Sequence, residues 1–398
     1  MKTQDLSRRK KRPPSRIPRV GVLVDTCTTW GRLVCAGIQK YADRHGPWLV
    51  FIEPLGVEEH VTLPKGWLVD GVIARIGHPS LARELRALKR PVVNVSGILL
   101  RNDTFSRVAN DLSTSGKMAA QYFLDLGYQS FAYFNLQGLT YVKAHQKAFA
   151  EKLAESGYPC ASYSVRPKHG AIPDKNLNLK ELGKWLNSLP KPVAVLSWNA
   201  SPSREVLFAC QLTGLLVPEE VSILSGSDDD LLCAMAHIPI SGIQVAGEEI
   251  GYQAAKLLDS LLLRKTQKKK TILIPPPGIT RRRSTDNLAI SDKALAKAIS
   301  FVRTHAAYPI QVADIATYSG LSRRALERKF ELVLGRSPAT EIRRVHVERA
   351  KELLATTDMP IPEVTEKSGF GSPEYLSFVF RQDVGQTPLK YRRSIRNR

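Results

Sequence analysis

Between residues 19 and 264, short apolar runs alternate with longer helical stretches, and this alternation constrains the fold more than any other feature of the chain. Continuous apolar runs such as RVGVLVD (19–25) are typical of strands buried on both faces. Helices of ten or more residues between such strands predict parallel, doubly wound sheets. The stretch from 19 to 285 is longer than one such sheet needs, so we expect two α/β lobes.

The alternation predicts the following elements. Strands are expected at 19–25, 48–54, 70–76, 91–96, 107–110, 130–136, 161–165, 193–198 and 222–227. Helices are expected at 31–46, 79–89, 113–127, 140–157, 178–189, 202–214 and 247–264.

The pattern breaks at KKKTILIPPPGITRRRSTDNLAISD (268–292). Three consecutive prolines end the last strand, and the arginine-rich segment after them is polar, so we expect it to be exposed. Beyond residue 290 the pattern indicates helices only. The predicted organisation is therefore a flexible basic arm at 1–18, an α/β ligand-sensing domain at 19–285 and an all-α domain at 286–398.

The chain has a formal net charge of +21 at pH 7, and an excess of this size favours association with a polyanion, most commonly nucleic acid. Charge alone leaves open a simple role in solubility. The distribution favours nucleic acid, because the basic residues form clusters: Arg8–Arg12, Lys268–Lys270, Arg281–Arg283, and Arg392, Arg393, Arg396 and Arg398.

The five cysteines form no CxxC pair and no cluster with histidines, which favours a reducing compartment over a disulfide-linked secreted protein. The basic start is not followed by the apolar segment of a secretory signal, and no apolar run is long enough to span a membrane. We therefore expect a cytoplasmic protein that uses no metal and no cofactor.

The C-terminal part contains a near-repeat with a spacing of fifty residues. Each copy has a short helix, a glycine turn and a second helix, which is the pattern of a helix-turn-helix unit. The repeated positions are Leu326, Phe330, Gly335 and Pro338 in the first copy and Leu376, Phe380, Gly385 and Pro388 in the second.

The second helix of each copy has a face that can contact DNA. Leu326 and Phe330, four residues apart, are expected to face the core, so that the arginines lie outward and can enter a major groove. The alternative is a small helical bundle with a solvated charged face. The candidate DNA-binding residues are Ser322, Arg323, Arg324, Glu327 and Arg328 in the first unit and Ser372, Glu374, Tyr375, Ser377 and Phe378 in the second.

The segment GFGSPEYLSFVFRQDVGQTPLKYRR (369–393) resembles the signature of the AraC/XylS family of transcription regulators, in which a long helix, here 338–355, joins two such units. The resemblance implies sequence-specific binding to operator DNA. Two positions depart from the family pattern. Asp383 stands where a basic residue is usual. Phe378 stands on a face that often carries arginine, where it either touches a thymine methyl group or indicates that the second unit mainly positions the protein.

The first 285 residues resemble the periplasmic-binding-protein-like sensors of LacI/GalR-type regulators. Segments that support a resemblance along the chain are FIE (51–53), DGVIA (70–74), GYQAAKLL (251–258) and RRSTD (282–286). The resemblance implies a homodimer that binds a small-molecule effector, such as the pentose D-xylose, and activates sugar-catabolism genes, with RNA polymerase as a plausible further partner.

Sensors of this architecture bind ligands between their lobes, at the carboxyl ends of the strands. Candidate ligand-binding residues at such positions are Trp30, Asp111, Asn199 and Asp228, each of which could instead be a helix cap or a turn residue. A fifth is His145, which stands where related sensors usually have an arginine. Because an imidazole cannot form that bidentate contact, and because Arg75 stands where an acid is usual, another sugar or a non-sugar metabolite remains an alternative effector.

A carbohydrate-processing enzyme would be the main alternative from another class, with Asp228, Asp229 and Asp230 as its acids. Glycosidases need two carboxylates on opposite sides of a bond, whereas three consecutive carboxylates in a loop point apart. No GxSxG, phosphate-binding loop or zinc spacing occurs in the sequence. We therefore expect no enzymatic activity and no catalytic residues.

Overall fold

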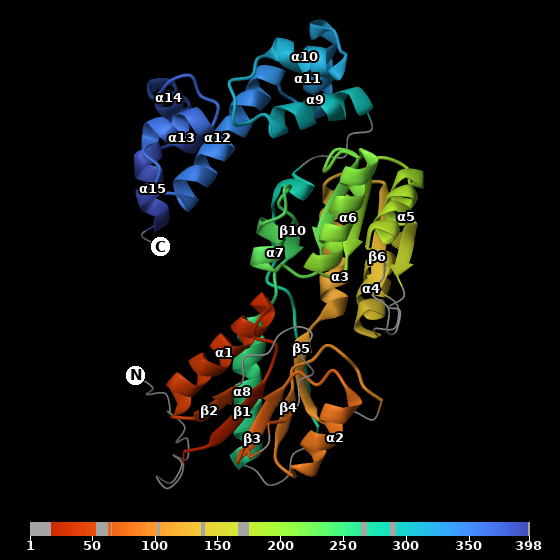
Figure 1. The fold of residues 1–398 in the computed structure, drawn as a ribbon, viewed down its shortest axis with the longest axis vertical. Helices are drawn as coiled ribbons and strands as arrows, with labels where there is room; N and C mark the ends of the chain where they lie inside the picture. The colour runs from red at the N-terminus through yellow and green to blue at the C-terminus, as the bar shows by residue number, and fades with distance from the viewer. Residues whose placement is uncertain are drawn as a thin grey trace, which may run out of the picture.

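The computed structural model describes residues 17–52, 63–64, 66–101, 104–136, 140–165, 175–263, 269–286 and 292–396. Apart from its last two residues, the predicted basic arm lies outside these ranges. Two α/β lobes and a helical domain follow one another along the longest axis of the molecule, with the helical domain beyond the second lobe (Figure 1). The expected fold class, an α/β sensor with two lobes followed by an all-α domain, is confirmed.

The first lobe is built on a parallel sheet with the strand order β11-β5-β4-β3-β1-β2. Two helices cover one face and a third covers the other, in separate apolar cores. The strands are β1 (Arg19–Leu23), β2 (Leu49–Ile52), β3 (Gly71–Ala74), β4 (Val92–Asn94), β5 (Ser106–Asn110) and β11 (Thr271–Ile274). The helices are α1 (Thr29–His45) and α8 (Gly247–Leu263) on one face and α2 (Pro79–Ala87) on the other.

The second lobe has the order β12-β10-β9-β8-β6-β7, in which only the pairing of β12 with β10 is antiparallel among the described strand pairs. Its strands are β6 (Ser130–Leu136), β7 (Cys160–Val165), β8 (Val193–Ser197), β9 (Val221–Ser225), β10 (Ser241–Ile243) and β12 (Ile279–Thr280). One face is covered by α3 (Leu112–Asp125) and α4 (Thr140–Ala154), and the other by α5 (Lys175–Ser188), α6 (Ala200–Thr213) and α7 (Asp230–Ala234).

The chain crosses between the lobes three times: after β5, after β10 and after β11. The strands and helices expected from the alternation are present with shifts of a few residues at their ends. The sequence pattern missed α7, β10 and β12, because elements of five, three and two residues are too short to show a period.

The expectation that the arginine-rich segment is exposed holds for Arg281 and Arg283 but was wrong for the two residues that follow them. The 3-10 turn η1 (Arg283–Thr285) lies against the edge of the second sheet, and Ser284 and Thr285 are buried. Ser284 Oγ donates to the carbonyl of Ile223 at 2.6 Å and accepts from the amide of Ser241 at 2.9 Å. Small hydroxyl side chains satisfy the polar groups of this segment, so a polar sequence is compatible with burial.

The helical domain has two apolar cores that share one long helix. Its elements are α9 (Lys293–Thr304), α10 (Val312–Ser319), α11 (Arg323–Leu334), α12 (Pro338–Thr356), α13 (Ile361–Lys367), α14 (Pro373–Val384) and α15 (Pro388–Arg396). The first half of α12 packs with α9–α11, and its second half packs with α13–α15. The repeated apolar pairs are fully buried, one in each core, as expected: Leu326 and Phe330, and Leu376 and Phe380. Gly320 (φ 72°) ends α10 in the left-handed conformation that makes the helix-turn-helix bend.

Helices α1 and α8 are in close contact because each presents a glycine to the other's backbone. A Cβ atom added at Gly37 would lie 1.9 Å from the carbonyl oxygen of Glu248, and one added at Gly251 would lie 2.0 Å from that of Val34. Neither neighbour is a flexible side chain, so the two helices would have to separate to admit a methyl group.

We therefore expect Gly37→Ala to destabilise the protein by about 3 kcal/mol, in the range of overpacked cores. In an open helix the same change would stabilise by about 1 kcal/mol, so the sign itself is diagnostic. Urea unfolding measures the effect. Gly371→Ala is the control, because a Cβ there would meet no atom within 4 Å. Equal stability of Gly37→Ala and the wild type would contradict the close contact.

Candidate functional site

A cavity of about 290 Å³ lies between the two lobes, at the carboxyl ends of β5, β8 and β9. Side chains from both lobes and from the crossing segments form its walls. All five residues selected from the sequence contribute to this lining: Trp30, Asp111, His145, Asn199 and Asp228. The carboxyl ends of parallel strands meet at one edge of a sheet, which is why residues distant in sequence come together here.

Two of these residues are also helix caps, as the alternative interpretation predicted. Asp111 accepts hydrogen bonds from the amide of Thr114 at 3.0 Å and from its hydroxyl at 2.8 Å, at the start of α3. Asn199 accepts from the amide of Ser201 at 3.0 Å, at the start of α6. A carboxylate has about four acceptor directions, so the two contacts of Asp111 leave acceptor capacity for a ligand.

His145 is buried in the wall of the cavity on α4. Its Nδ1 lies 2.9 Å from the hydroxyl of Tyr133, and its Nε2 lies 3.2 Å from that of Ser115. Desolvation lowers its pKa from 6.5 to about 4, so the imidazole is neutral at pH 7. A ligand therefore meets a neutral ring whose two nitrogens already have partners, at the position where an arginine would present a charge.

Aromatic rings line the cavity on both sides. The guanidinium of Arg75 lies 5.6 Å from the ring centroid of Trp30 and forms an ion pair with the buried Asp25. The indole N–H of Trp30 is buried and has no hydrogen-bond partner among the described residues. Tyr141 and Trp198 were not among the residues selected from the sequence, yet they line the same cavity, with their rings edge to face and their ring centroids 6.4 Å apart. Trp198 directly follows the end of β8 and Tyr141 lies at the start of α4, and these positions could have indicated both residues in the sequence.

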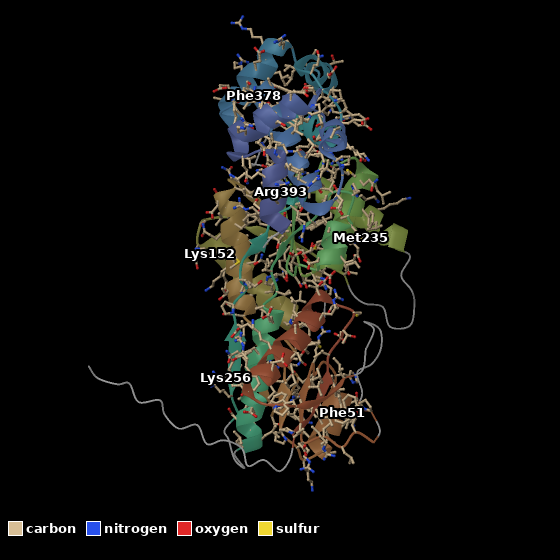
Figure 2. The ribbon with its side chains drawn as sticks, turned by 90° about the vertical axis from the view of Figure 1, so that its left-hand side faces the viewer. Phe51, Lys152, Met235, Lys256, Phe378 and Arg393 are labelled. Carbon is tan, nitrogen blue, oxygen red and sulfur yellow. The ribbon has the colours of Figure 1, made fainter. Side chains whose placement is uncertain are left out.

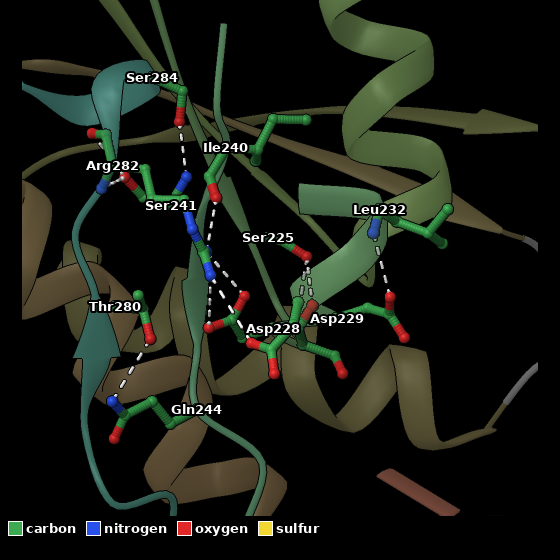
Figure 3. Close-up of polar contacts among 12 residues, drawn as sticks. Ser225, Asp228, Asp229, Leu232, Ile240, Ser241, Gln244, Thr280, Arg282 and Ser284 are labelled. Carbon is green, nitrogen blue, oxygen red and sulfur yellow. Dashed lines mark hydrogen bonds and ion pairs between the residues drawn. The ribbon is translucent and has the colours of Figure 1, made fainter. Parts of the chain in front are cut away.

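Asp228 differs from the sequence-based expectation, because both of its oxygens already have a partner. Arg282 Nη1 lies 2.7 Å from Oδ1, and Nη2 lies 3.3 Å from Oδ2 (Figure 3). The neighbouring Asp229 caps α7 through the amide of Leu232 at 3.1 Å, and its other oxygen accepts from the amide of Thr29 in the first lobe at 3.2 Å. The loop after β9 in the second lobe therefore lines the cavity and is also hydrogen-bonded to the first lobe.

The outer face of α11 carries the polar residues expected of a DNA-contacting helix. Ser322 caps the helix by accepting from the amide of Ala325 at 3.3 Å. Arg323 and Glu327 form an exposed ion pair at 3.1 Å. Arg324 and Arg328 are exposed, and neither forms an ion pair with another described residue.

The outer face of α14 is less basic and more aromatic. Ser372 caps it through the amide of Tyr375 at 3.2 Å. A hydrogen bond from the backbone amide of Glu374, and then one from the hydroxyl of Ser372, lower the pKa of the exposed Glu374. Tyr375 and Phe378 are about half exposed, while Ser377 is partly buried. Figure 2 shows Phe378 on the surface of the helical domain, well away from the two lobes.

Within the described ranges, no three His, Cys, Asp or Glu side chains are grouped so that they could hold a metal ion. Among the same residues, no helix is long and apolar enough to cross a bilayer.

Because burial lowers the pKa of His145, we expect the folded protein to lose stability in acid. Unfolded histidine binds its proton near pH 6.5, whereas the folded group binds it only near pH 4, so a fall in pH through this window stabilises the unfolded chain. We expect about 2 kcal/mol of stability to be lost through His145 between pH 7 and pH 5.

Urea unfolding of His145→Gln should lack this part of the pH dependence. The contribution of His346, whose pKa burial also lowers to about 4, will remain in the variant. His78→Gln, which changes an exposed histidine, is the control. A pH dependence identical in His145→Gln and the wild type would mean that His145 is protonated in the folded protein.

Two family descriptions match consecutive parts of the chain: a periplasmic binding protein-like domain at residues 120–285 and a helix-turn-helix domain at residues 315–394. The LacI family regulator from Enterococcus faecium, solved with bound ribose, has a TM-score of 0.54 at 18% identity and covers 68% of this chain and all of its own. At that identity the likeness concerns the fold of the sensor alone.

Other relatives match both parts together. The xylose operon regulatory protein of Haemophilus influenzae is 28% identical over 94% of this chain and 98% of its own, and that of Escherichia coli K12 is 27% identical over 94% and 96%. The structure of a xylose-binding transcription activator has a TM-score of 0.82 at 26% identity and covers 96% of this chain and 99% of its own. These relatives are transcription regulators and not enzymes. The chain is therefore a transcription regulator that resembles the xylose operon regulatory proteins along its length, with a periplasmic-binding-protein-like sensor followed by a helix-turn-helix DNA-binding domain.

Proposed function

We propose that this regulator activates sugar-catabolism genes when a pentose such as D-xylose occupies the cavity between its lobes. The observation that carries the proposal is the chemistry of that cavity, which combines three aromatic rings with carboxylate and amide side chains. Sugars present apolar ring faces and many hydroxyl groups, and these side chains match both. The names of the relatives that span the chain support a pentose.

The size of the cavity supports a small effector. Pockets for small molecules hold about 300–1,000 Å³, and this cavity, at about 290 Å³, is at the lower limit. A single monosaccharide suits that volume better than a disaccharide. The ligand-binding set is Trp30, Asp111, His145, Asn199 and Asp228, with Tyr141 and Trp198 as additional ring contacts.

Operator DNA is the macromolecular partner in this proposal. The N-terminal turns of α11 and α14 enter successive major grooves, as helix-turn-helix units do. The contact residues are Ser322, Arg323, Arg324, Glu327 and Arg328 on α11, and Ser372, Glu374, Tyr375, Ser377 and Phe378 on α14. The regulator acts in the cytoplasm as a homodimer on paired half-sites, and activation involves contact with RNA polymerase.

Asp111→Asn separates a ligand-binding role from a capping role, because asparagine caps helices about as well as aspartate. We expect D-xylose to bind the variant about tenfold more weakly, since hydrogen bonds to a charged acceptor are about twice as strong as neutral ones. Calorimetry with D-xylose, and in parallel with L-arabinose, D-ribose and D-glucose, measures the affinity.

Asp292→Asn is the control, because Asp292 caps α9 in the helical domain. Unchanged affinity for D-xylose in Asp111→Asn would reduce Asp111 to a cap. Tighter binding of another sugar by the wild type would replace D-xylose as the effector.

Arg324→Ala tests the DNA-binding face of α11. We expect a loss of about 1–3 kcal/mol in operator affinity and a relaxed base preference if the guanidinium contacts a guanine edge. Gel-shift titrations at one salt concentration, on operator and on random duplex, separate base recognition from phosphate contact. Arg44→Ala removes an exposed charge from the sensor and is the control. Operator binding by Arg324→Ala at wild-type strength would exclude this face.

A further inference from the structure

One loop contacts the cavity, the first lobe and the segment that leads to the helical domain. Residues 226–229 lie between β9 and α7, and Asp228 and Asp229 in this loop line the cavity. Asp229 accepts from the amide of Thr29 at the start of α1, 3.2 Å away, so the loop is bonded to the first lobe. Asp228, in contrast, forms an ion pair with Arg282, in the segment that leads to the helical domain. A change in the cavity therefore acts on two neighbouring carboxylates with different partners.

The pair of Asp228 and Arg282 is largely withdrawn from water. The side chains are 7% and 16% exposed, and the guanidinium contacts both carboxylate oxygens, at 2.7 and 3.3 Å. Its Nη1 also donates to the carbonyl of Ile240 at 2.9 Å. Gly242 allows this approach, because a Cβ atom there would lie 2.9 Å from the Cα and Cβ atoms of Asp228. The loop, the start of β10 and Arg282 thus form one packed unit (Figure 3).

The backbone of Arg282 is fixed as firmly as its side chain. Its amide donates to the hydroxyl of Ser241 at 2.8 Å, and this hydroxyl lies 3.0 Å from the Arg282 carbonyl. The same hydroxyl lies 2.6 Å from that of Thr285, which is 2.7 Å from the hydroxyl of Tyr122 on α3. These hydrogen bonds join the backbone of Arg282 to β10 and to η1, so we expect the three to move together.

The residues that follow Arg282 contact the helical domain directly. Arg283 Nη2 donates to the carbonyl of Arg303 on α9 at 3.4 Å. Arg303 in turn forms an ion pair at 3.5 Å with Glu219 of the second lobe, and their side chains are only 9% and 1% exposed. Asp286 lies 4.0 Å from Arg344 on α12. The partner of the cavity acid, Arg282, is therefore followed directly in the chain by Arg283, which contacts α9.

We propose that Arg282 is the residue that couples the cavity to the DNA-binding domain, because an effector and its guanidinium share the two oxygens of Asp228. This inference rests on the proposed function. Two of about four acceptor directions are used by the arginine, and a sugar hydroxyl that donates to Asp228 takes up another and draws negative charge away from the guanidinium. The longer contact, from Nη2 to Oδ2 at 3.3 Å, weakens first, and η1 with the α9 contacts moves with it.

Arg282→Lys separates coupling from folding and from charge. Lysine keeps the positive charge beside Asp228, but its ammonium cannot contact both oxygens in the fixed geometry of a guanidinium. Arg281→Lys is the matched control, because Arg281 precedes Arg282 in the same segment and its guanidinium lies 5.2 Å from the ring centroid of Tyr122 instead of on a carboxylate.

The experiment measures two affinities in full-length protein at one salt concentration. D-xylose binding is titrated with and without an operator duplex, and duplex binding is titrated with and without D-xylose. Coupling between two sites is reciprocal, so both ratios must equal one factor, typically about 5- to 150-fold. We expect this factor in the wild type and in Arg281→Lys, and a factor below about twofold in Arg282→Lys, whose D-xylose affinity stays within about tenfold of the wild type.

Three results would count against the proposal. An unchanged factor in Arg282→Lys shows that coupling follows another route. Complete loss of D-xylose binding in this folded variant makes Arg282 part of the binding site and not a coupling residue. The proposed function itself is contradicted if the wild type does not bind D-xylose, or if D-xylose does not change its affinity for the duplex. This outcome is seen in the wild type, before any variant is compared.

Discussion

The three crossings between the lobes are the constraint on which the rest of the structure depends. Because each sheet contains strands from both sides of a crossing, neither lobe can form from one continuous stretch of chain. The crossings also lie beside the cavity, where Asp111 and Gln244 belong to its walls. Any change in the angle between the lobes therefore moves the residues of the cavity, and the last crossing leads through β12 into η1 and the helical domain.

Most of the fold could be predicted because its long elements have a clear period. Several buried strands, such as β1 and β3, are continuous apolar runs. The two helix-turn-helix units repeat an apolar pair four residues apart, Leu326 and Phe330 in the first unit. The burial of Ser284 and Thr285 could not be predicted, since it depends on hydrogen bonds to β9 and β10, at least 40 residues earlier in the chain. A polar segment has no period that distinguishes these partners from water.

The candidate cavity could likewise be predicted only in part. Asp111, Asn199 and Asp228 follow strand ends, which a sequence pattern locates, whereas Trp30 and His145 lie on helices; all five line the cavity. Their partners are set by tertiary structure: Arg282 is 54 residues from Asp228, and Arg75 lies against Trp30 and Asp25 from another strand end. The type of residue at these positions was visible, but the direction in which each side chain is held was not.

The sharing of α12 between two cores has a geometric consequence for the domain. The 19 residues of this helix span about 28 Å at 1.5 Å per residue, close to the rise of about 34 Å in one turn of a DNA duplex. Each residue inserted into the helix would also rotate the second unit by about 100° about the axis. The length of α12 therefore sets both the separation and the phase of the two units. An insertion that keeps both cores intact would still turn α14 away from its present orientation relative to α11.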